Sequence, residues 1–583
     1  MKIYQLMQRR ECFNTYGMER KHNQHWQFLE DELIAEIQNF EKVYSSRAQK
    51  LLLEEEKMYV GQFVGFRNGQ MLIKFPNTRS VPRKREFLFC MLLPADLRLY
   101  RNWGDKTYED LYGLRYKGSD AVCIWHDSSD DPRCTLVGLS DVDLDFAKFI
   151  ADTPGLLLVF APKRPPIEYL ANLQAVIEDV NNLGLINLAT SKRIWSPELI
   201  REDEIDVFIK ANMENKLTTI LQGPPGTGKT YLIAKLCHLF SCEGKSVLVT
   251  ALTNRALMEV AEKETLCDLL TEGKVSKTNL TANEVNELPT LSSATEIDPA
   301  PGTITLATFY KASDYARYME ENSKFDIVIM DEASQAFTAM FAACCKMGGK
   351  QLWVGDTKQM PPIVLLSQER ILRNNYTPYI EGFQFVADHS SEPVYQLTAT
   401  RRYGKRAAEF TGVFYNGSLE TKVGQQDILI PEKLKNYLSP NGGPAYIPIN
   451  LNVGDLRPLN AIDYIVSIVR DYLAINPKKE IAVLAHQVKT VNAIQMELSR
   501  NGINTPNVIA DTVARVQGLT TDIVIYLLVN SSYMFSLEPK LFNVATSRAR
   551  EHTIILGDKS LFSGAKSHEV QMFLDKLNPN QSV

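Results

Sequence analysis

Residues 221–230 read LQGPPGTGKT and decide the fold of the region around them. They match the pattern G-x-x-x-x-G-K-[ST] of a phosphate-binding P-loop. An apolar run at residues 217–221 precedes the glycines, and a helical pattern, YLIAKLCHLF, follows them. The motif requires this order of strand, loop and helix, because loop N–H groups and a helix N-terminus then surround a phosphate. The stretch therefore predicts a nucleotide-binding α/β domain.

Length and composition indicate a globular protein with several domains. The 583 residues exceed what one hydrophobic core supports. Hydrophobic residues make up 45% and charged residues 23% of the chain, as in ordinary globular proteins. The net charge of −5 argues against binding of nucleic acid over the whole surface, although a local basic groove remains open. No run approaches the ~18 apolar residues of a membrane span, so no membrane partner is expected.

The nine cysteines give no sign of a metal site or of a disulfide framework. They are scattered, with no CxxC pair and no Cys/His spacing typical of zinc. This usage favours a reducing, cytoplasmic setting.

Changes in the hydrophobic pattern divide the chain into regions. Apolar residues recur at intervals of three and four across residues 24–57, which predicts one long helix. Strand-like alternation follows, and two later regions alternate short apolar runs with helical patterns, as parallel α/β domains do. The polar segment 262–302 lacks this rhythm and is expected to be an insertion. The predicted regions are an N-terminal segment with a long stalk helix (1–57), a small β-barrel or sandwich (58–165), a return helix and linker (166–195), a first α/β domain with the P-loop (196–384) and a second α/β domain (385–583).

A second nucleotide element reads FDIVIMDEASQ at residues 325–335. Asp331 is placed to hold Mg²⁺ opposite Thr230, and Glu332 to polarise the water that attacks a γ-phosphate. Acidic residues also favour the first turn of any helix, so the pair alone is a weak signal. About a hundred residues after a P-loop it is a strong one.

A third element, WVGDTKQMPP at residues 353–362, places Gln359 just past another predicted strand. An uncharged amide at this edge can sense the γ-phosphate and report it elsewhere. By itself the stretch is also explained as a turn with a double proline.

Two arginine elements lie in the second half of the chain. They read LTATRRY at residues 397–403 and NVATSRAR at residues 543–550. Phosphoryl transfer needs added positive charge near the γ-phosphate, and a guanidinium suits that role. If the second domain supplies it, the site is complete only when the domains close. Surface ion pairing is the ordinary alternative for any single arginine.

The densest basic stretch is RSVPRKR at residues 79–85, in a loop of the predicted barrel. Such loops are most often solvated faces. The alternative is that Arg83, Lys84 and Arg85 grip a phosphate backbone.

In this order, GPPGTGKT, DEASQ, GDTKQMPP, an arginine element, VARVQG and NVATSRAR resemble the motifs of superfamily 1 helicases. The most similar branch contains the nonsense-mediated decay helicase and its relatives, of which GDxxQxPP and FYNGSL (residues 414–419) are typical. The resemblance covers roughly residues 24–570. It implies an α/β fold with two tandem RecA-like parallel-sheet domains, preceded by a helical stalk and a small β-barrel.

The same resemblance implies three groups of site residues. The phosphates and the nucleotide are expected to contact Gly223, Pro224, Gly226, Thr227, Gly228, Lys229, Thr230, Gln517 and Gly518, with Thr230 and Asp331 on Mg²⁺. Catalysis is expected to use Lys229, Glu332 as base, Gln359 as γ-phosphate sensor, and Arg402 and Arg548 as arginine fingers. Nucleic acid is expected to contact Thr253, Asn254, Thr308 and Tyr310, although Tyr310 is equally explained as a core aromatic.

Three stretches depart from the family pattern. Residues 204–208 (EIDVF) lack the glutamine that reads adenine, so NTPs other than ATP are expected to be accepted. Residues 518–520 (GLT) replace Gly-x-Glu, which removes one sugar or coupling contact. Residues 400–402 (TRR) replace Gln-Tyr-Arg, and the alignment favours Arg402 over Arg401 as the finger.

The leading hypothesis is an ATP-dependent helicase or translocase, with 5′ to 3′ movement implied by the family branch. An ATP-gated clamp or scaffold that recruits a partner without unwinding stays open as the alternative. A small-molecule kinase would leave the elements at residues 353–362 and 543–550 without a role. The sequence does not distinguish DNA from RNA, and we expect a separate protein partner to supply targeting or nuclease activity.

Overall fold

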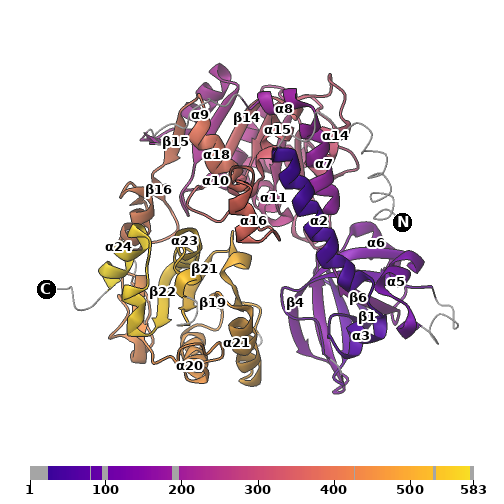
Figure 1. The fold of residues 1–583 in the computed structure, drawn as a ribbon, viewed down its shortest axis with the longest axis vertical. Helices are drawn as coiled ribbons and strands as arrows, with labels where there is room; N and C mark the ends of the chain where they lie inside the picture. Colours follow the sequence, from indigo (N-terminus) through magenta and orange to yellow (C-terminus); the bar gives the residue numbers. More distant parts are fainter. Residues whose placement is uncertain are drawn as a thin grey trace.

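The computed structural model describes residues 24–78, 80–94, 103–186, 196–201, 203–425, 427–503, 505–529 and 533–577. These residues form a closed six-stranded barrel, a nine-stranded sheet, a five-stranded sheet and a two-stranded sheet. In Figure 1 the nine-stranded domain lies at the top, the barrel at the lower right and the five-stranded domain at the lower left. The predicted α/β class is confirmed.

A helical stalk joins the barrel to the first α/β domain (Figure 1). It consists of α2 (Gln24–Tyr44), the short α3 (Ala48–Leu53) and α7 (Ile167–Glu178), which packs along α2. The single helix expected over residues 24–57 is therefore two helices. The hydroxyls of Ser45 and Ser46 donate to the carbonyls of Glu41 and Lys42, and such back-bonding competes with continuation of a helix.

The barrel is antiparallel, with the strand order β1-β2-β5-β4-β3-β6. Side chains that point inward alternate with exposed ones, and aromatic and β-branched residues such as Phe63, Ile73 and Phe75 fill the interior. Its elements are β1 (Tyr59–Arg67), β2 (Gln70–Pro76), β3 (Phe87–Leu92), η3 (Trp103–Asp105), α5 (Tyr108–Leu114), β4 (Lys117–Ser128), β5 (Cys134–Ser140), α6 (Leu144–Ala151) and β6 (Leu157–Pro162).

The first α/β domain is built on a parallel sheet with the order β11-β10-β12-β9-β13-β14-β8-β15-β7. Its strands are β7 (Glu198–Ile200), β8 (Thr218–Gln222), β9 (Val247–Ala251), β10 (Val275–Thr278), β11 (Ser292–Ala294), β12 (Ile304–Thr308), β13 (Phe325–Met330), β14 (Gly348–Gly355) and β15 (Val394–Leu397). Its helices are α8 (Val180–Gly184), α9 (Ile205–Asn215), α10 (Lys229–Cys242), α11 (Asn254–Ala261), η4 (Glu264–Leu266), α12 (Cys267–Thr271), α13 (Ala282–Glu287), α14 (Phe309–Tyr318), η5 (Ala333–Gln335), α15 (Thr338–Met347), α16 (Gln368–Arg373), α17 (Thr377–Ile380) and α18 (Gly382–His389).

Two sequence expectations are changed by this sheet. The segment 262–302, expected to be an insertion, contributes β10 and β11, because β10 pairs with β12. The sheet also extends past residue 385, since β15 pairs with β8 next to the P-loop. These three strands are only three or four residues long, which is too short for their hydrophobic pattern to reveal them.

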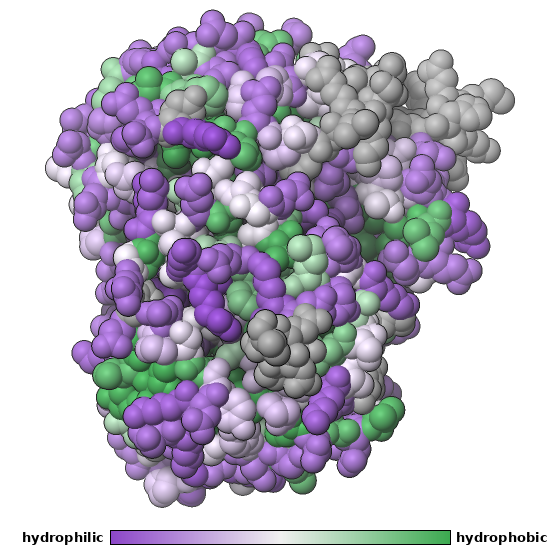
Figure 2. Space-filling view, turned by 90° about the vertical axis from the view of Figure 1, so that its left-hand side faces the viewer, coloured by the Kyte–Doolittle hydropathy of each residue, from purple (hydrophilic) through white to green (hydrophobic). Residues whose placement is uncertain are grey.

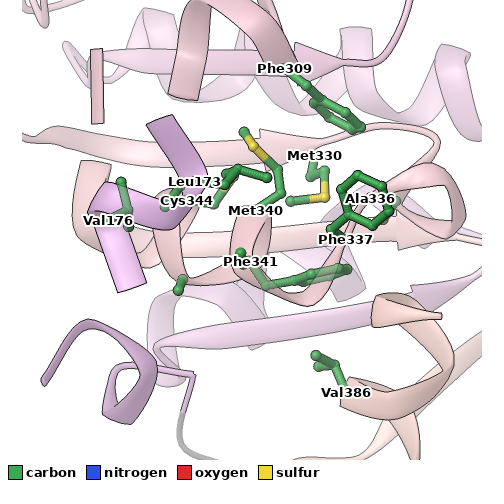
Figure 3. Packing of buried hydrophobic residues seen from close by; sticks show 14 of the residues in the cluster. Leu173, Val176, Phe309, Met330, Ala336, Phe337, Met340, Phe341, Cys344 and Val386 are labelled. Carbon is green, nitrogen blue, oxygen red and sulfur yellow. The ribbon is translucent and has the colours of Figure 1, made fainter. Parts of the chain in front are cut away.

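Buried side chains fill both faces of this sheet. On one face, Phe309, Met330, Phe337 and Met340 pack with the stalk residue Leu173, as Figure 3 shows. This core fixes the carboxyl end of β13, from which the candidate site residues emerge.

The second α/β domain holds a parallel sheet with the order β18-β22-β21-β19-β20. Its elements are β16 (Ala399–Thr400), α19 (Lys405–Thr411), η6 (Gly412–Tyr415), β17 (Glu420–Thr421), η7 (Glu432–Leu434), β18 (Gly443–Pro448), α20 (Leu459–Ile475), β19 (Ile481–Ala485), α21 (Val488–Arg500), β20 (Val508–Thr512), η8 (Val513–Val516), β21 (Thr521–Leu527), α22 (Tyr533–Ser536), α23 (Pro539–Thr546), β22 (Ala549–Gly557), η10 (Lys559–Ser563) and α24 (His568–Leu577).

The face that carries β16 and α24 is mostly hydrophilic, with apolar side chains in smaller groups (Figure 2). In the part of the chain that the structure describes, no helix is both long and apolar enough to cross a membrane.

Candidate nucleotide site and nucleic-acid surface

The P-loop connects β8 to α10 at the carboxyl edge of the first sheet. Lys229, the first residue of α10, folds back over this loop. Its Nζ donates to the carbonyl oxygens of Gly223 at 2.6 Å and of Pro224 at 3.4 Å. Burial lowers the pKa of this ammonium group. The lysine is thus held by weak neutral acceptors at a position where a phosphate oxygen would be a stronger partner.

A cavity of about 360 Å³ opens above the P-loop, between the two α/β domains. Its volume lies within the usual range for sites that bind small molecules. Most of the residues expected at the nucleotide line it, namely Gly226, Thr227, Gly228, Lys229, Thr230, Asp331, Glu332, Gln359, Arg402, Gln517, Gly518 and Arg548. Gly223 and Pro224 lie behind them, as the acceptors of Lys229. None of residues 204–208 lines the cavity.

Asp331 and Glu332 stand at the end of β13 and face this cavity. The backbone N–H of Glu332 donates to Oδ1 of Asp331 at 2.8 Å. Burial raises the pKa of Asp331 to about 6. Burial, followed by the nearby charge of Asp331, raises the pKa of Glu332 to about 7. A carboxyl group with a pKa near neutrality is well suited to accept a proton from water.

The donor set for Mg²⁺ is one hydroxyl, Thr230, and one carboxylate, Asp331, on the same cavity. Hard oxygen donors of this kind suit Mg²⁺, which keeps several waters and takes further oxygens from nucleotide phosphates. Within the described ranges there is no cluster of three or more His, Cys, Asp or Glu side chains that could bind a metal without such help. The residues present therefore fit a metal that arrives with the nucleotide.

The arginine element at residues 400–402 packs directly on the P-loop. The N–H of Arg401 donates to the carbonyl of Gly226 at 2.8 Å, and the Thr400 hydroxyl donates to that of Pro225 at 3.2 Å. The guanidinium of Arg402 reaches the other side of the cavity, where Nη1 donates to the carbonyl of Ser547 at 2.9 Å. Arg402 thus touches both walls of the cleft.

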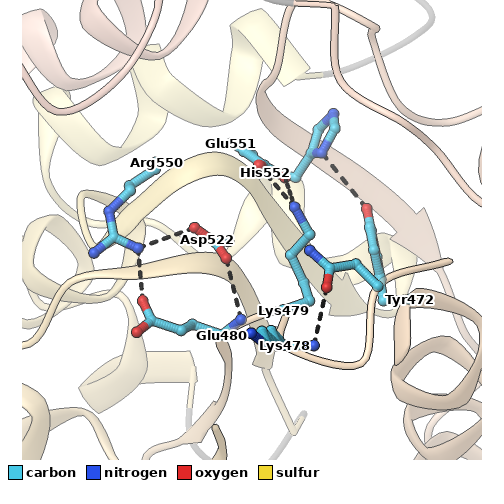
Figure 4. Close-up of polar contacts among 9 residues, drawn as sticks. Tyr472, Lys478, Lys479, Glu480, Asp522, Arg550, Glu551 and His552 are labelled. Carbon is cyan, nitrogen blue, oxygen red and sulfur yellow. Dashed lines mark hydrogen bonds and ion pairs between the residues drawn. The ribbon is translucent and has the colours of Figure 1, made fainter. Parts of the chain in front are cut away.

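The two arginines of the last motif have different surroundings. Arg548 is 2% exposed, and its Nη2 lies 3.4 Å from Oε1 of Gln359 in the first domain. Burial, followed by the charge of Arg402, lowers the pKa of Arg548 to about 10. Arg550 instead pairs with Glu480 at 2.6 Å and Asp522 at 2.9 Å, as Figure 4 shows. Only Arg548 of this pair contacts the γ-phosphate sensor predicted from the sequence.

Asp356, which the sequence reasoning did not select, organises the base of the cleft. Its carboxylate accepts hydrogen bonds from Gln222 Nε2 at 2.6 Å, Gln359 Nε2 at 2.8 Å and the Tyr415 hydroxyl at 2.7 Å. Asn543 Nδ2 donates to the same hydroxyl at 2.9 Å. The available signal was its position directly after an apolar strand, which is also the position of Asp331.

The motif VARVQG at residues 513–518 reaches the cavity from the second domain. Gly518 has a φ of +82°, and a Cβ placed on it would lie 3.4 Å from Oε1 of Glu332. Its neighbour Gln517 lines this cavity and also a second one of about 240 Å³. One residue therefore borders both cavities.

The residues expected to contact nucleic acid lie near the second cavity. Thr253 and Thr308 are the N-cap residues of α11 and α14, and Asn254 begins α11. Leu252, next to Thr253, and Tyr310 line the cavity. Tyr310 is 40% exposed, with its ring centroid 5.2 Å from that of Tyr169, so it is a cavity wall rather than a core residue.

The structure corrects the expectation for the basic loop. Nε of Arg85 lies 3.0 Å from Oδ2 of Asp511, and Nη2 donates to the carbonyl of Arg515 at 2.7 Å. This guanidinium joins the barrel to the second α/β domain, so it does not project into solvent towards a phosphate. Arg83 is exposed and Lys84 is half-buried, while Arg79 lies outside the described residues.

In its ordered motifs, and in matches to family models and to curated relatives, the chain is similar to known helicases. Two family models, both described as an AAA domain, match residues 205–368 and 453–560. The chain is 24% identical over 370 residues to the DNA replication ATP-dependent helicase/nuclease DNA2 of Gallus gallus. This alignment covers 58% of this chain and 34% of that protein. It is 24% identical over 428 residues to the Schizosaccharomyces pombe counterpart, over 66% of this chain and 30% of that protein.

The chain thus spans about a third of the length of these relatives. Among solved structures, the crystal structure of Arterivirus nonstructural protein 10 (helicase) aligns with a TM-score of 0.38 at 13% identity. The alignment covers 92% of this chain and 82% of that one.

Proposed function

We propose that this protein is an ATP-dependent motor that moves along single-stranded nucleic acid and separates duplexes. The observation that carries the proposal is the shared cavity. P-loop residues of the first domain and Arg402 and Arg548 beyond it line one space, so nucleotide and domain closure are linked. A motor needs such a link, because each cycle of hydrolysis must open and close a grip.

In the proposed cycle, the phosphates of the nucleotide draw Lys229 away from the carbonyls of Gly223 and Pro224. Thr230 and Asp331 would hold Mg²⁺, which would supply positive charge against the phosphates. Glu332 accepts the proton of the attacking water. Charge that develops on the γ-phosphoryl group is stabilised by Arg402 and Arg548, which burial has already stripped of water.

Gln359 is proposed to report the γ-phosphate. Its amide is held between Asp356 of its own domain and Arg548 of the other. A change at the phosphate would therefore alter a bond that crosses the cleft. Gln517 and Gly518 lie in the second domain between the nucleotide and the second cavity, and they are proposed to pass this change to the strand.

The proposed substrate is single-stranded DNA or RNA, with 5′ to 3′ movement taken from the helicase branch that the motifs resemble. The names of the matched relatives combine a helicase with a nuclease in DNA replication. For this chain we propose a separate partner that supplies targeting or cutting. Because residues 204–208 are away from the cavity, we also propose that NTPs other than ATP are hydrolysed.

The decisive test compares the ATPase rate with single-stranded DNA and with single-stranded RNA of the same sequence, followed by displacement of a strand from duplexes with 5′ or 3′ overhangs. Stimulation and displacement from 5′ overhangs are expected. Stimulation without displacement would replace the motor by an ATP-gated clamp. An ATPase indifferent to both polymers would overturn the proposal.

A further inference from the structure

The second cavity lies where the stalk, the first α/β domain and the second α/β domain meet. Glu36 of α2 and Tyr169 of α7 line it on the stalk side, Tyr310, Phe337 and Pro361 on the side of the first domain, and Gln517 on the side of the second. Figure 1 shows α2 and α7 beside each other at the edge of the first α/β domain. None of these elements is a neighbour of another in sequence, so the cavity exists only in the assembled fold.

Two polar side chains that line this cavity, the buried Tyr169 and the half-buried Glu36, form no hydrogen bond with a described residue. Tyr169 is 5% exposed, and its hydroxyl has no hydrogen-bond partner among the described residues. A buried hydroxyl without a partner costs about 1–3 kcal/mol, so its retention needs an explanation. Glu36 likewise forms no hydrogen bond or ion pair with a described residue. Burial, followed by the charge of Glu32, raises the pKa of Glu36 to about 7, as expected for a carboxyl group that lacks a donor.

The neighbouring Glu32 shows the contrast. Its carboxylate lines the same cavity but accepts the backbone N–H groups of Leu365 and Leu366, at 2.6 and 3.2 Å. Glu32 therefore has a structural role on the loop that follows Pro361. Glu36, one helical turn further along α2, has none.

Three aromatic rings line the cavity, together with aliphatic side chains, prolines and two glutamines. The ring centroids of Tyr169 and Tyr310 are 5.2 Å apart in an edge-to-face arrangement, and those of Tyr169 and Phe337 are 6.1 Å apart and stacked. The site is thus apolar and aromatic, with hydrogen-bond acceptors at one side and no basic residue among those that line it. A phosphate is excluded by Glu32 and Glu36, whereas a planar ring that carries an N–H₂ group fits both features.

We propose that this cavity holds one base of the bound single strand and selects bases with an exocyclic amino group, cytosine, adenine and guanine, over thymine and uracil, which have none. The inference rests on the proposed function and adds a sequence preference to it. Glu36 accepts from the amino group, as Glu does from cytosine N4 in other nucleic-acid complexes, and the Tyr169 hydroxyl bonds a ring nitrogen or carbonyl. Tyr310 supplies the stacking surface.

The position of the cavity links base capture to the nucleotide. Gln517 borders both cavities, and Pro361 follows Gln359 by two residues. Cleft closure moves Gln517 relative to Pro361, so the base is held more tightly or released at each step. The preference is therefore expected in ATPase stimulation as well as in affinity.

The test measures binding of the full chain to oligodeoxynucleotides of deoxycytidine and of thymidine of equal length, together with the ATPase rate that each one stimulates. The cytosine strand is expected to bind about tenfold more tightly. Glu36→Gln is expected to reduce this ratio to about twofold. The amide can accept a hydrogen bond from the amino group of cytosine and can donate one to the carbonyl of thymine, so it no longer distinguishes the two bases. The matched control is Glu41→Gln on the exposed face of α2.

Two further variants separate base recognition from packing. Tyr169→Phe removes only the unsatisfied hydroxyl, so it should leave thermal stability unchanged or raised while it lowers affinity for the cytosine strand. Tyr310→Ala should weaken both strands about tenfold, whereas Tyr318→Ala at the exposed end of α14 should not.

The possible results distinguish failure of the base pocket from failure of the proposed motor. Equal affinity for both strands, with stimulated ATPase, would overturn the base pocket and leave the motor intact. A cytosine preference that survives both Glu36→Gln and Tyr169→Phe would place base reading elsewhere and overturn the pocket too. Failure of these strands, and of the RNA strands of cytidine and uridine tested beside them, to bind or to stimulate would overturn the motor and the pocket together.

Discussion

Gly226 of the P-loop and Arg402 lie in direct contact across the cleft. A Cβ placed on Gly226 would lie 2.5 Å from Cβ of Arg402 and 2.5 Å from Oγ1 of Thr400. The φ of Gly226 is +76°, a conformation that residues with side chains rarely adopt. The glycine therefore serves two purposes, since it allows the left-handed turn of the loop and leaves room for the arginine.

Gly226→Ala should prevent this approach, so the arginine cannot reach the transferring phosphoryl group. We expect the strand-stimulated kcat to fall at least about a hundredfold. The matched control is Gly244→Ala, which has the same φ of +76° but no atom within 4 Å of the added methyl. An equal loss of activity in both variants would attribute the effect to backbone strain.

Lys229→Ala should abolish hydrolysis with the fold intact, because it removes the ammonium group that lies against the P-loop carbonyls, where we propose that the phosphates bind. A loss of at least about a thousandfold in kcat is expected. Circular dichroism and thermal unfolding check the fold. Lys235 lies on the same helix as Lys229 and pairs with Asp206 of α9. Lys235→Ala removes this ion pair and should retain the activity. Unchanged turnover in Lys229→Ala would refute the site assignment.

Tyr415→Phe should loosen the docking of the two α/β domains. The change removes the 2.7 Å bond to Asp356 and leaves the Asn543 amide without that acceptor. A cost of about 1–3 kcal/mol in the free energy of unfolding is expected for the loss of a buried bond to a charged group. A double-mutant cycle with Asn543→Ala measures the shared part. Additive effects would show that the two side chains act independently.

The stalk should weaken in acid through His25. This ring is 4% exposed and stacks on Tyr379 with centroids 4.6 Å apart, and burial lowers its pKa to about 3. The folded state binds fewer protons than the unfolded state between pH 6.5 and about 3. The free energy of unfolding therefore decreases as the pH is lowered through that window, by up to about 1.4 kcal/mol per pH unit. Urea unfolding at a series of pH values measures the slope.

His25→Phe should remove this contribution. Carboxyl groups with raised pKa values, such as Glu36, titrate with the opposite sign, so the difference between the two proteins isolates the histidine. His568→Phe at the exposed start of α24 is the control. Parallel stability curves for His25→Phe and the unaltered protein would contradict the prediction.

Arg85→Ala should release the barrel from the second α/β domain. It leaves the buried Asp511 carboxylate without its cation, which costs about 1–3 kcal/mol locally. Hydrogen exchange should rise in β20 and η8 and in the barrel loop before β3. The neighbouring Arg83→Ala should have no such effect because Arg83 is exposed. Equal exchange in both variants would show that this ion pair does not fix the barrel.

Some of the site followed from the sequence because its residues are close together along the chain. The local sequence of a P-loop, or of an apolar strand that ends in Asp331 and Glu332, is enough to predict how its residues are arranged. The link among Gln222, Asp356, Tyr415 and Asn543 does not, since its four members come from separate elements and meet only when two sheets dock.

The errors in the fold have equally local causes. Two serine hydroxyls end the stalk helix at Tyr44, although the apolar spacing continues beyond it. Arg85 was expected to be solvated because its neighbours are basic, and only the position of Asp511 on another domain shows otherwise. The spacing of hydrophobic residues indicates which side chains of one helix or strand are buried. It does not indicate which surfaces of separate domains contact each other.

The Arg85–Asp511 bridge also has a topological consequence. Barrel, stalk, first domain, cleft contacts and second domain form a circuit of contacts, which the bonds of Arg85 to Asp511 and to the carbonyl of Arg515 close at the barrel. A strand that ran inside such a circuit would be encircled. A linear strand could thread in from a free end, whereas a closed circle could enter only after these contacts had opened, so Arg85 would help to set how quickly the protein loads onto nucleic acid without ends.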